Sequence, residues 1–253
     1  MYTFYSEGFF GYGEKGDFTY FSFWHFLPIV LLAAAILLVY RYREQLRTWK
    51  WEGRARFLYA FVMLLAEMSY FWRLVYVGDE TGAYNMLGKL PLQVCQWGLI
   101  CSVFALMSKN DLLFNINFYI SISFATLALI TPAVIVRAGP TYFRYYQFWM
   151  EHEMPILAAF YMMFVHQKKL RYRYLWVTWG LLFLMGLLCA YVNNHIPGAE
   201  YMYLVSDPED RIGTSIADLM PRTQSVRFVV FGVVAAALFH LEYFIWKKAH
   251  REE

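Results

Sequence analysis

The sequence predicts an all-α membrane protein, a bundle of seven transmembrane helices with its N-terminus outside the cell and its C-terminus in the cytoplasm. The composition is the first observation: 60% of the 253 residues are hydrophobic and only 16% are charged. Soluble domains carry roughly 25% charged and about 45–50% apolar residues. The second observation is an aromatic share of 21%, with Tyr and Trp gathered near the ends of apolar runs, where bilayer interfaces favour them.

The predicted spans are seven stretches of mostly apolar residues, each close to the 20 or so residues that cross a hydrocarbon core about 30 Å thick. They cover residues 21–40, 57–76, 90–107, 112–136, 145–165, 174–191 and 226–246. Backbone in lipid must satisfy its own hydrogen bonds, so all seven are predicted to be helices. No basic region and small-residue cleavage site precede the first run, which is therefore expected to be a retained anchor.

The loops set the expected orientation. Fourteen of the 22 lysines and arginines fall in the first, third and fifth loops or in the C-terminal tail, and six fall on the other side. The positive-inside rule then places the first set in the cytoplasm, as in a multi-pass protein of the cell (inner) membrane. The one long connection, residues 192–225, lies outside and is expected to form a short lid over the bundle. The net charge of +3 is small and dispersed, so no nucleic-acid partner is expected.

Polar residues inside the spans are the candidates for function, because a charged side chain at the bilayer centre costs about 2.5–3.5 kcal/mol on insertion scales. With the predicted helix directions, most of them fall in the outer half: His25, Arg73, Gln93, Cys95, His152, Cys189, Asn194 and Arg227. Glu67 falls near the middle. This asymmetry predicts a polar cavity that opens outward.

Two prolines sharpen the prediction. Pro91 suits the first turn of the third span, which places Cys95 near a helix N-terminus, where the partial positive charge stabilises a thiolate. Pro155 removes the hydrogen bond to the carbonyl of Glu151 and predicts a kink beside His152. Glu151 and Glu153 point in different directions, and the sequence leaves open which of them faces the cavity.

Each candidate also has a structural interpretation. Cys95 is equally well explained as a small apolar filler, and His152 as an interhelical hydrogen-bond partner. Glu67 and Arg73 are compatible with a buried structural pair, and His25 with an interfacial anchor. The cysteines show no metal-ligand spacing, HExxH and phosphate-loop motifs are absent from the sequence, and neither a metal nor a cofactor is expected.

Short motifs in order along the chain resemble the YwaF-like family of bacterial integral membrane proteins. They are Phe21-Ser22-x-x-His25, Glu67-x-x-Tyr70-x-Trp72, Leu90-Pro91-Leu92-Gln93-Val94-Cys95, Thr131-Pro132, Tyr145-Tyr146-Gln147-Phe148-x-x-x-His152, Asn194, Tyr201-x-Tyr203-Leu204, Pro208 and Ser215-x-x-Asp218. That family is in turn distantly similar to the eukaryotic transmembrane protein 164, an acyltransferase with a membrane-embedded cysteine. One position departs from the family pattern, because Gln93 stands where the pattern has His. If that His is a catalytic base in the family, this chain lacks it and has either a different base or no catalysis.

The resemblance implies lipid acyl transfer or hydrolysis at a site open to the outer leaflet, with membrane lipid as the partner. Carried onto this chain, it implies Cys95 as the nucleophile and His152 as the base, and Glu151 or Glu67 would orient the imidazole. The expected substrate contacts are an oxyanion donor among Gln93, Gln96 and Asn194, and a phosphate ligand in Arg73 or Arg144. The alternative is a non-catalytic transporter or binding protein for a small polar solute or lipid headgroup in the same cavity. The acyl donor and acceptor and the oligomeric state stay open.

Overall fold

The computed structural model describes residues 8–11, 18–77, 90–132, 138–197, 199–204 and 223–250, and this part of the chain is helical without strands. Its elements are α1 (Phe23–Arg41), α2 (Arg43–Thr48), α3 (Glu52–Val77), α4 (Val94–Ser108), α5 (Asp111–Ile120), the π-helix η2 (Ser121–Ala125), α6 (Thr126–Ile130), α7 (Phe143–Phe164), α8 (Tyr172–His195) and α9 (Gln224–Ala249). Each predicted span coincides with one of these helices, or with the continuous α5–η2–α6 rod. The end of the fourth predicted span, residues 133–136, lies outside the described residues.

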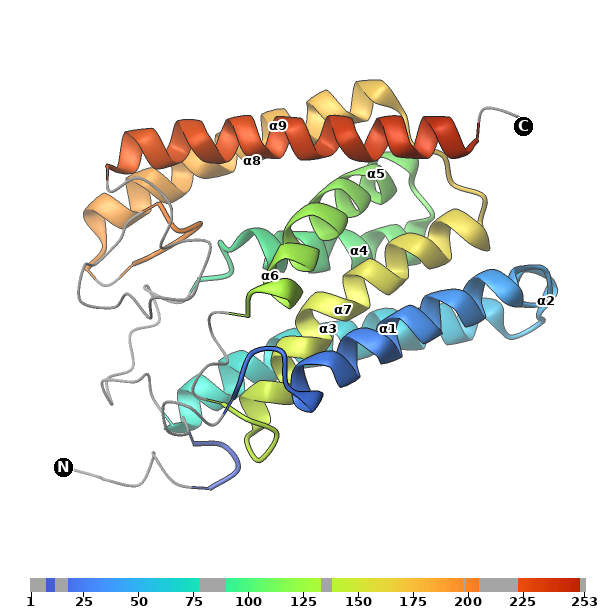
Figure 1. Ribbon diagram of the computed structural model, residues 1–253, viewed down its shortest axis with the longest axis horizontal. Coiled ribbons are helices and arrows are strands. Elements are labelled where there is room, and N and C mark those ends of the chain that lie inside the picture. The colour runs from blue at the N-terminus through green and yellow to red at the C-terminus, as the bar shows by residue number, and fades with distance from the viewer. Residues whose placement is uncertain are drawn as a thin grey trace.

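The long helices run back and forth between two ends of the molecule (Figure 1). One end, at the left of Figure 1, holds residues 8–11 and 199–204, and we call it the loop end. The opposite end holds α2 and the C-terminal end of α9, and we call it the α2 end. Of the predicted lid, residues 192–195 continue α8, residues 205–222 lie outside the described part, and residues 199–204 are described at the loop end.

Among the described residues, five helical segments are long and apolar enough to cross a membrane: α1, α3, the α5–η2–α6 rod, α8 and α9. α4 is apolar but has only 15 residues, and the 22-residue α7 contains Arg144, Glu151 and Glu153. α1 buries only His25 and Pro28 among its 19 residues, while leucines such as Leu37 are 66% exposed. So much exposed apolar surface on a helix fits contact with lipid. The fold is that of a multi-pass membrane protein.

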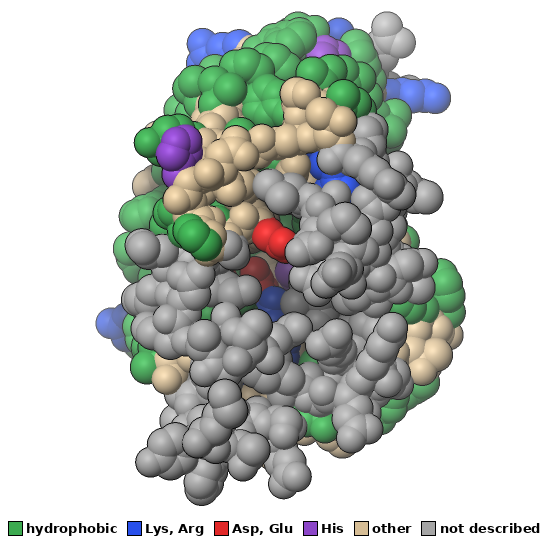
Figure 2. All heavy atoms as spheres, turned by 90° about the vertical axis from the view of Figure 1, so that its left-hand side faces the viewer, with side chains coloured by type: hydrophobic (Ala, Val, Ile, Leu, Met, Phe, Trp, Pro, Cys, Tyr) green, Lys and Arg blue, Asp and Glu red, His purple; other side chains and the backbone are tan. Residues whose placement is uncertain are grey.

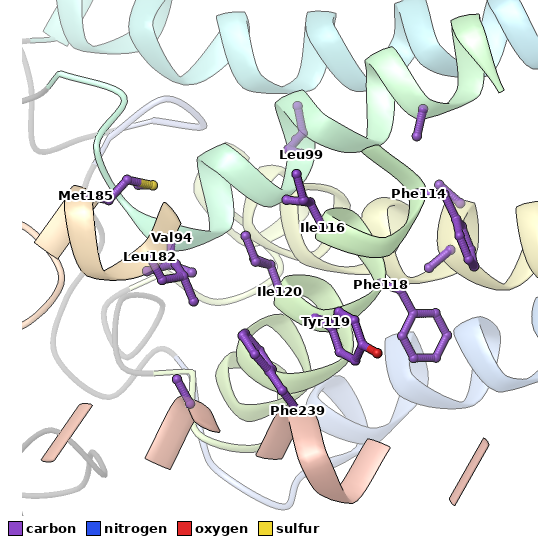
Figure 3. Close-up of a cluster of buried hydrophobic side chains, with 14 of the residues drawn as sticks. Val94, Leu99, Phe114, Ile116, Phe118, Tyr119, Ile120, Leu182, Met185 and Phe239 are labelled. Carbon is purple, nitrogen blue, oxygen red and sulfur yellow. The ribbon is translucent and has the colours of Figure 1, made fainter. Parts of the chain in front are cut away.

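The largest core cluster joins α4, α5, α8 and α9 (Figure 3). The cluster includes Leu99 on α4, Phe114 and Ile120 on α5, Leu182 on α8 and Phe239 on α9. α4 and α5 approach closely at Gly98, where an added Cβ would lie 2.9 Å from a side-chain methyl on α5. α7 packs against α1, α3 and α4, so its polar residues face other helices.

A network of polar side chains closes the α2 end. Glu52 Oε1 accepts hydrogen bonds from Arg56 Nε at 2.8 Å, Tyr161 Oη at 2.9 Å and His166 Nε2 at 2.8 Å. Arg56 also donates to the carbonyl of Leu106 at the end of α4. Burial lowers the pKa of the His166 imidazole below its ordinary value, and the hydrogen bond to Glu52 offsets part of this effect. The network ties α3, α4 and α7 together.

Candidate functional site

The candidate site is a polar cluster built on α3, α4 and α7, and its base is one face of α7. Arg144, Gln147 and Glu151 follow each other at spacings of three and four residues, so they share that face. Glu151 Oε2 accepts hydrogen bonds from Arg144 Nη1 at 3.2 Å and from Gln147 Nε2 at 3.0 Å. The Arg144 guanidinium also lies 4.7 Å from the centre of the Tyr70 ring on α3. The buried Glu151 carboxylate is therefore paired with a cation.

A second carboxylate enters the cluster from α3. Glu67 is only 5% exposed, and its Oε1 accepts a hydrogen bond from Gln96 Nε2 at 2.8 Å. Glu67 Oε2 and Gln147 Oε1 are buried and have no hydrogen-bond partner among the described residues. A buried acceptor left without a donor costs about 1–3 kcal/mol. The two atoms therefore mark places where a bound molecule with N–H or O–H groups would be stabilised.

Cys95 lies in the first turn of α4, next to Gln96. α4 packs against α3 and α7, the helices that carry Glu67 and Glu151. Both carboxylates would repel a thiolate, and the N-terminus of α4 opposes them with its partial positive charge. Cys95 forms no hydrogen bond to a side chain in the described part of the chain. A reaction at this sulfur therefore needs a base that takes the thiol proton.

His152 is held in an orientation suited to that task. Its Nδ1 lies 2.8 Å from the carbonyl oxygen of Phe148, which can only accept, so the proton sits on Nδ1 and Nε2 carries the lone pair. The imidazole packs on the Phe148 ring with the ring centres 4.3 Å apart. Glu151, expected from the sequence to orient this imidazole, instead pairs with Arg144 and Gln147. Cys95 and His152 form no hydrogen bond with each other in the described part of the chain, although their helices, α4 and α7, pack against each other.

Gln93 acts as a structural clamp. Its backbone N–H donates to Gln96 Oε1 at 3.1 Å at the start of α4. Its side chain accepts from the Met202 N–H and donates to the Glu200 carbonyl, both at 3.0 Å. The side-chain oxygen and the side-chain nitrogen of Gln93 therefore both bind the backbone of residues 199–204, which we call the clamped segment.

Other contacts fasten the clamped segment from α8 and α9. Asn193 exchanges two hydrogen bonds with the backbone of Tyr201, at 3.0 and 2.9 Å. Arg227 Nη1 donates to the carbonyl of Tyr203 at 2.8 Å. The segment needs such support, because Met202 and Tyr203 have φ angles of 56° and 54°. A left-handed backbone costs a residue with a side chain roughly 1–2 kcal/mol.

Three residues expected in the site contact the backbone or another helix instead. Arg73 donates from Nε and Nη2 to two carbonyls of the 8–11 segment, each at 2.9 Å. His25 accepts a backbone N–H at Nδ1, at 3.0 Å, and donates from Nε2 to a carbonyl of α6 at 2.8 Å. Asn194 donates to Gln224 on α9 at 3.0 Å.

Figure 2 looks onto the loop end of the molecule. Acidic, basic and histidine side chains are visible there at the bottom of a hollow. The described residues contain no group of three His, Cys, Asp or Glu side chains arranged to hold a metal ion.

The sequence pattern of the TMEM164 family matches residues 20–243. The chain belongs to the TMEM164 family. The predicted similarity to transmembrane protein 164 is thereby confirmed, whereas the YwaF-like assignment stays a prediction. None of the curated proteins and none of the solved structures matches the chain.

The site of this TMEM164-family protein contains two features that the sequence reasoning did not single out. The Arg144–Glu151 pair has a signal in the sequence, because seven residues are two helical turns and place both side chains on one face. The attachment of the clamped segment to the helices has none. The segment lacks periodicity, and its position depends on contacts from α4, α8 and α9.

Proposed function

We propose that this protein transfers or hydrolyses a lipid acyl chain, with Cys95 as the nucleophile and His152 as the base. The observation that carries the proposal is the orientation of the His152 imidazole. The Phe148 carbonyl fixes its tautomer, and Nε2 keeps a free lone pair on the helix that packs against α4, which carries Cys95. Membership of the TMEM164 family supports a membrane protein with acyltransferase-like chemistry.

In the proposed reaction, the thiol proton passes to His152 Nε2 as Cys95 Sγ attacks the ester carbonyl carbon of the lipid. The ester C–O bond then breaks, the acyl group stays on sulfur as a thioester, and His152 returns the proton to the departing alkoxide. A hydroxyl or amine of the acceptor attacks the thioester and gives its proton to His152, which restores the thiol. Water in the place of the acceptor gives hydrolysis. Cys95 and His152 must approach each other for the first step, as catalytic groups commonly do when substrate binds.

The remaining groups have supporting roles in this proposal. The side chains of Gln93 and Gln96 are occupied, and Gln93 caps the N–H of Gln96, so the N–H groups of Val94 and Cys95 in the first turn of α4 serve the oxyanion. Glu67 Oε2 and Gln147 Oε1 accept hydrogen bonds from the acceptor lipid. Arg144 neutralises Glu151 and has further N–H donors for a lipid phosphate.

The proposal includes an arrangement in the membrane. All seven helical segments cross the bilayer of the cell membrane, with the N-terminus outside, so the loop end faces outward. α4 and α7, which carry the cluster, cross inside the bundle, where α7 is shielded from lipid by α1 and α3. The acyl chain then stays in lipid while only the ester enters the polar cluster.

The test is turnover in proteoliposomes that contain a phospholipid donor and an isotope-labelled lysophospholipid acceptor, with products measured by mass spectrometry. Cys95→Ser and His152→Gln are each expected to lower the rate at least about 100-fold, in the usual range for a nucleophile or a general base. Cys101→Ser is the matched control, because Cys101 lies on the same helix outside the cluster and should keep the wild-type rate. Full activity of Cys95→Ser would exclude the proposed nucleophile.

A second function rests on the two unpaired acceptors and on the two carboxylates that oppose a thiolate at Cys95. A non-catalytic transporter or binding protein would use them to hold a small polar solute or a lipid headgroup with N–H or O–H donors. Glu67→Gln would then weaken binding or uptake, and Cys95→Ser would change neither. The turnover measurement separates the two functions.

A further inference from the structure

The turn between α2 and α3 carries two basic side chains that lie against one exposed aromatic ring. It belongs to the α2 end of the molecule, opposite the loop end (Figure 1). Lys50 Nζ lies 5.3 Å and the Arg54 guanidinium 4.2 Å from the centre of the Trp51 ring. The Trp51 side chain is 42% exposed, and both basic side chains are exposed as well. We call these three residues the basic corner, because they hold two positive charges together at the surface.

The acidic side chains nearest in the sequence are paired with other residues. Glu44 forms an ion pair with Arg47 at 2.8 Å. Glu52 turns into the protein, where it belongs to the network that closes the α2 end. Neither Lys50 nor Arg54 forms an ion pair with an acidic residue in the described part of the chain. Two neighbouring cations without an acidic partner favour the binding of an anion.

An exposed apolar stripe on α3 continues from the basic corner. It follows Arg54 at steps of four and three residues and consists of Leu58, Phe61, Leu65, Met68 and Trp72. This spacing places the side chains on one face of the helix, and they are between 39% and 63% exposed. At 1.5 Å per residue the stripe is about 27 Å long, which is close to the thickness of a hydrocarbon core. The surface therefore combines cations at one end with apolar contacts along its length.

We propose that the basic corner and the stripe bind an anionic phospholipid, with the headgroup phosphate at Lys50 and Arg54 and an acyl chain along α3. Trp51 suits this place because indole rings favour the boundary between headgroups and hydrocarbon. A soluble anion would use the two cations and leave the apolar stripe without a ligand. With the proposed orientation, the basic corner faces the cytoplasmic leaflet, whose anionic lipids attract basic residues next to a span. The binding is independent of the acyl chemistry proposed at Cys95.

The experiment titrates the purified full-length protein with phosphatidylglycerol and, separately, with phosphatidylcholine, and native mass spectrometry gives the Kd of each lipid. Phosphatidylglycerol is expected to bind about 25-fold more tightly, because each basic residue near an anionic lipid contributes roughly a factor of five. In the double variant Lys50→Gln/Arg54→Gln, the two Kd values should differ by less than about threefold. Both substituted side chains are exposed, so the helical content should not change, and circular dichroism checks this.

Lys169→Gln/Arg173→Gln is the matched control, because it removes the same charge from exposed side chains at the α2 end, around the start of α8. This control should keep the preference for phosphatidylglycerol. An equal loss of preference in both double variants would overturn the proposal, because the preference would then come from the general positive charge of the α2 end. A wild-type protein that binds the two lipids equally would overturn it as well. Displacement of phosphatidylglycerol by excess inorganic phosphate would assign the two cations to a soluble anion and contradict a lipid site.

Discussion

Replacing Gln93 tests whether this residue holds the clamped segment. Gln93→Ala removes the acceptor for the Met202 N–H and the donor to the Glu200 carbonyl, two hydrogen bonds of 3.0 Å each. Met202 is 2% exposed, so its N–H would be left buried without a partner, at a cost of about 1–3 kcal/mol. Glu200 is exposed, and water can replace its lost bond at little cost.

Together, the two lost hydrogen bonds should destabilise the closed state, in which the clamped segment is bound to the helices, by about 2 kcal/mol relative to the open state. Since 1.4 kcal/mol corresponds to a tenfold change, the open population should rise about 30-fold. Hydrogen–deuterium exchange of the peptide containing residues 199–204, measured in nanodiscs, reports this population through the Met202 amide. The same peptide reports the Tyr201 amide, which Asn193 binds independently.

Gln93→Glu is the matched variant, because it keeps an acceptor for the Met202 N–H and loses only the donor to the exposed carbonyl. Its exchange is expected within about fivefold of wild type. If Gln93→Ala changes exchange at Met202 by less than about threefold, the clamp does not hold the segment. The structural role assigned to Gln93 would then be refuted.

Three other substitutions test the packing and charges around the site. Arg144→Met should lower the free energy of unfolding by about 3–5 kcal/mol because it leaves the buried Glu151 without its cation, and adding Glu151→Gln should restore most of it; equal loss in both variants would contradict the pairing. The lowered pKa of His166 means that the unfolded state binds its proton more tightly, so stability should fall as the pH drops below about 6.5. His166→Gln should make the thermal unfolding midpoint depend less on pH over that range. A pH dependence of the midpoint equal to that of the wild type would contradict this prediction. Gly98→Ala should cost about 1–3 kcal/mol, since its Cβ would meet a methyl at 2.9 Å, whereas Gly180→Ala has open space and should cost nothing measurable in chemical unfolding.

The helices were predictable because their length and apolar character follow from the bilayer. The limits of prediction from hydropathy are visible in α7 and in the π-helix η2. α7 carries three charged residues, Arg144, Glu151 and Glu153, and is not among the five segments that are apolar enough to cross a membrane on composition alone. η2 has an ordinary helical sequence, and its π turn places Ser123 against Glu242 on α9, a contact that hydropathy does not encode.

For the candidate site, the sequence predicts depth but not the pairings of side chains. Depth along a helix comes from counting residues, and it directed attention to Cys95 and His152 in the outer half and to Glu67 near the middle. Which side chains meet depends on how the helices pack, so the Gln96–Glu67 bond had no signal in the sequence. Arg73 shows the same limit, because its partners are backbone carbonyls, which every residue possesses.

The most direct test of acyl chemistry at Cys95 is to trap the covalent intermediate. Purified protein is incubated with a phospholipid that carries an alkyne-tagged acyl chain, and the label is located by peptide mass spectrometry before and after hydroxylamine treatment. We predict a hydroxylamine-labile label on the peptide that contains Cys95, lost in Cys95→Ser, strongly reduced in His152→Ala and retained in Cys101→Ser. An unlabelled protein that still binds the lipid, or a label on a different cysteine, would contradict the account.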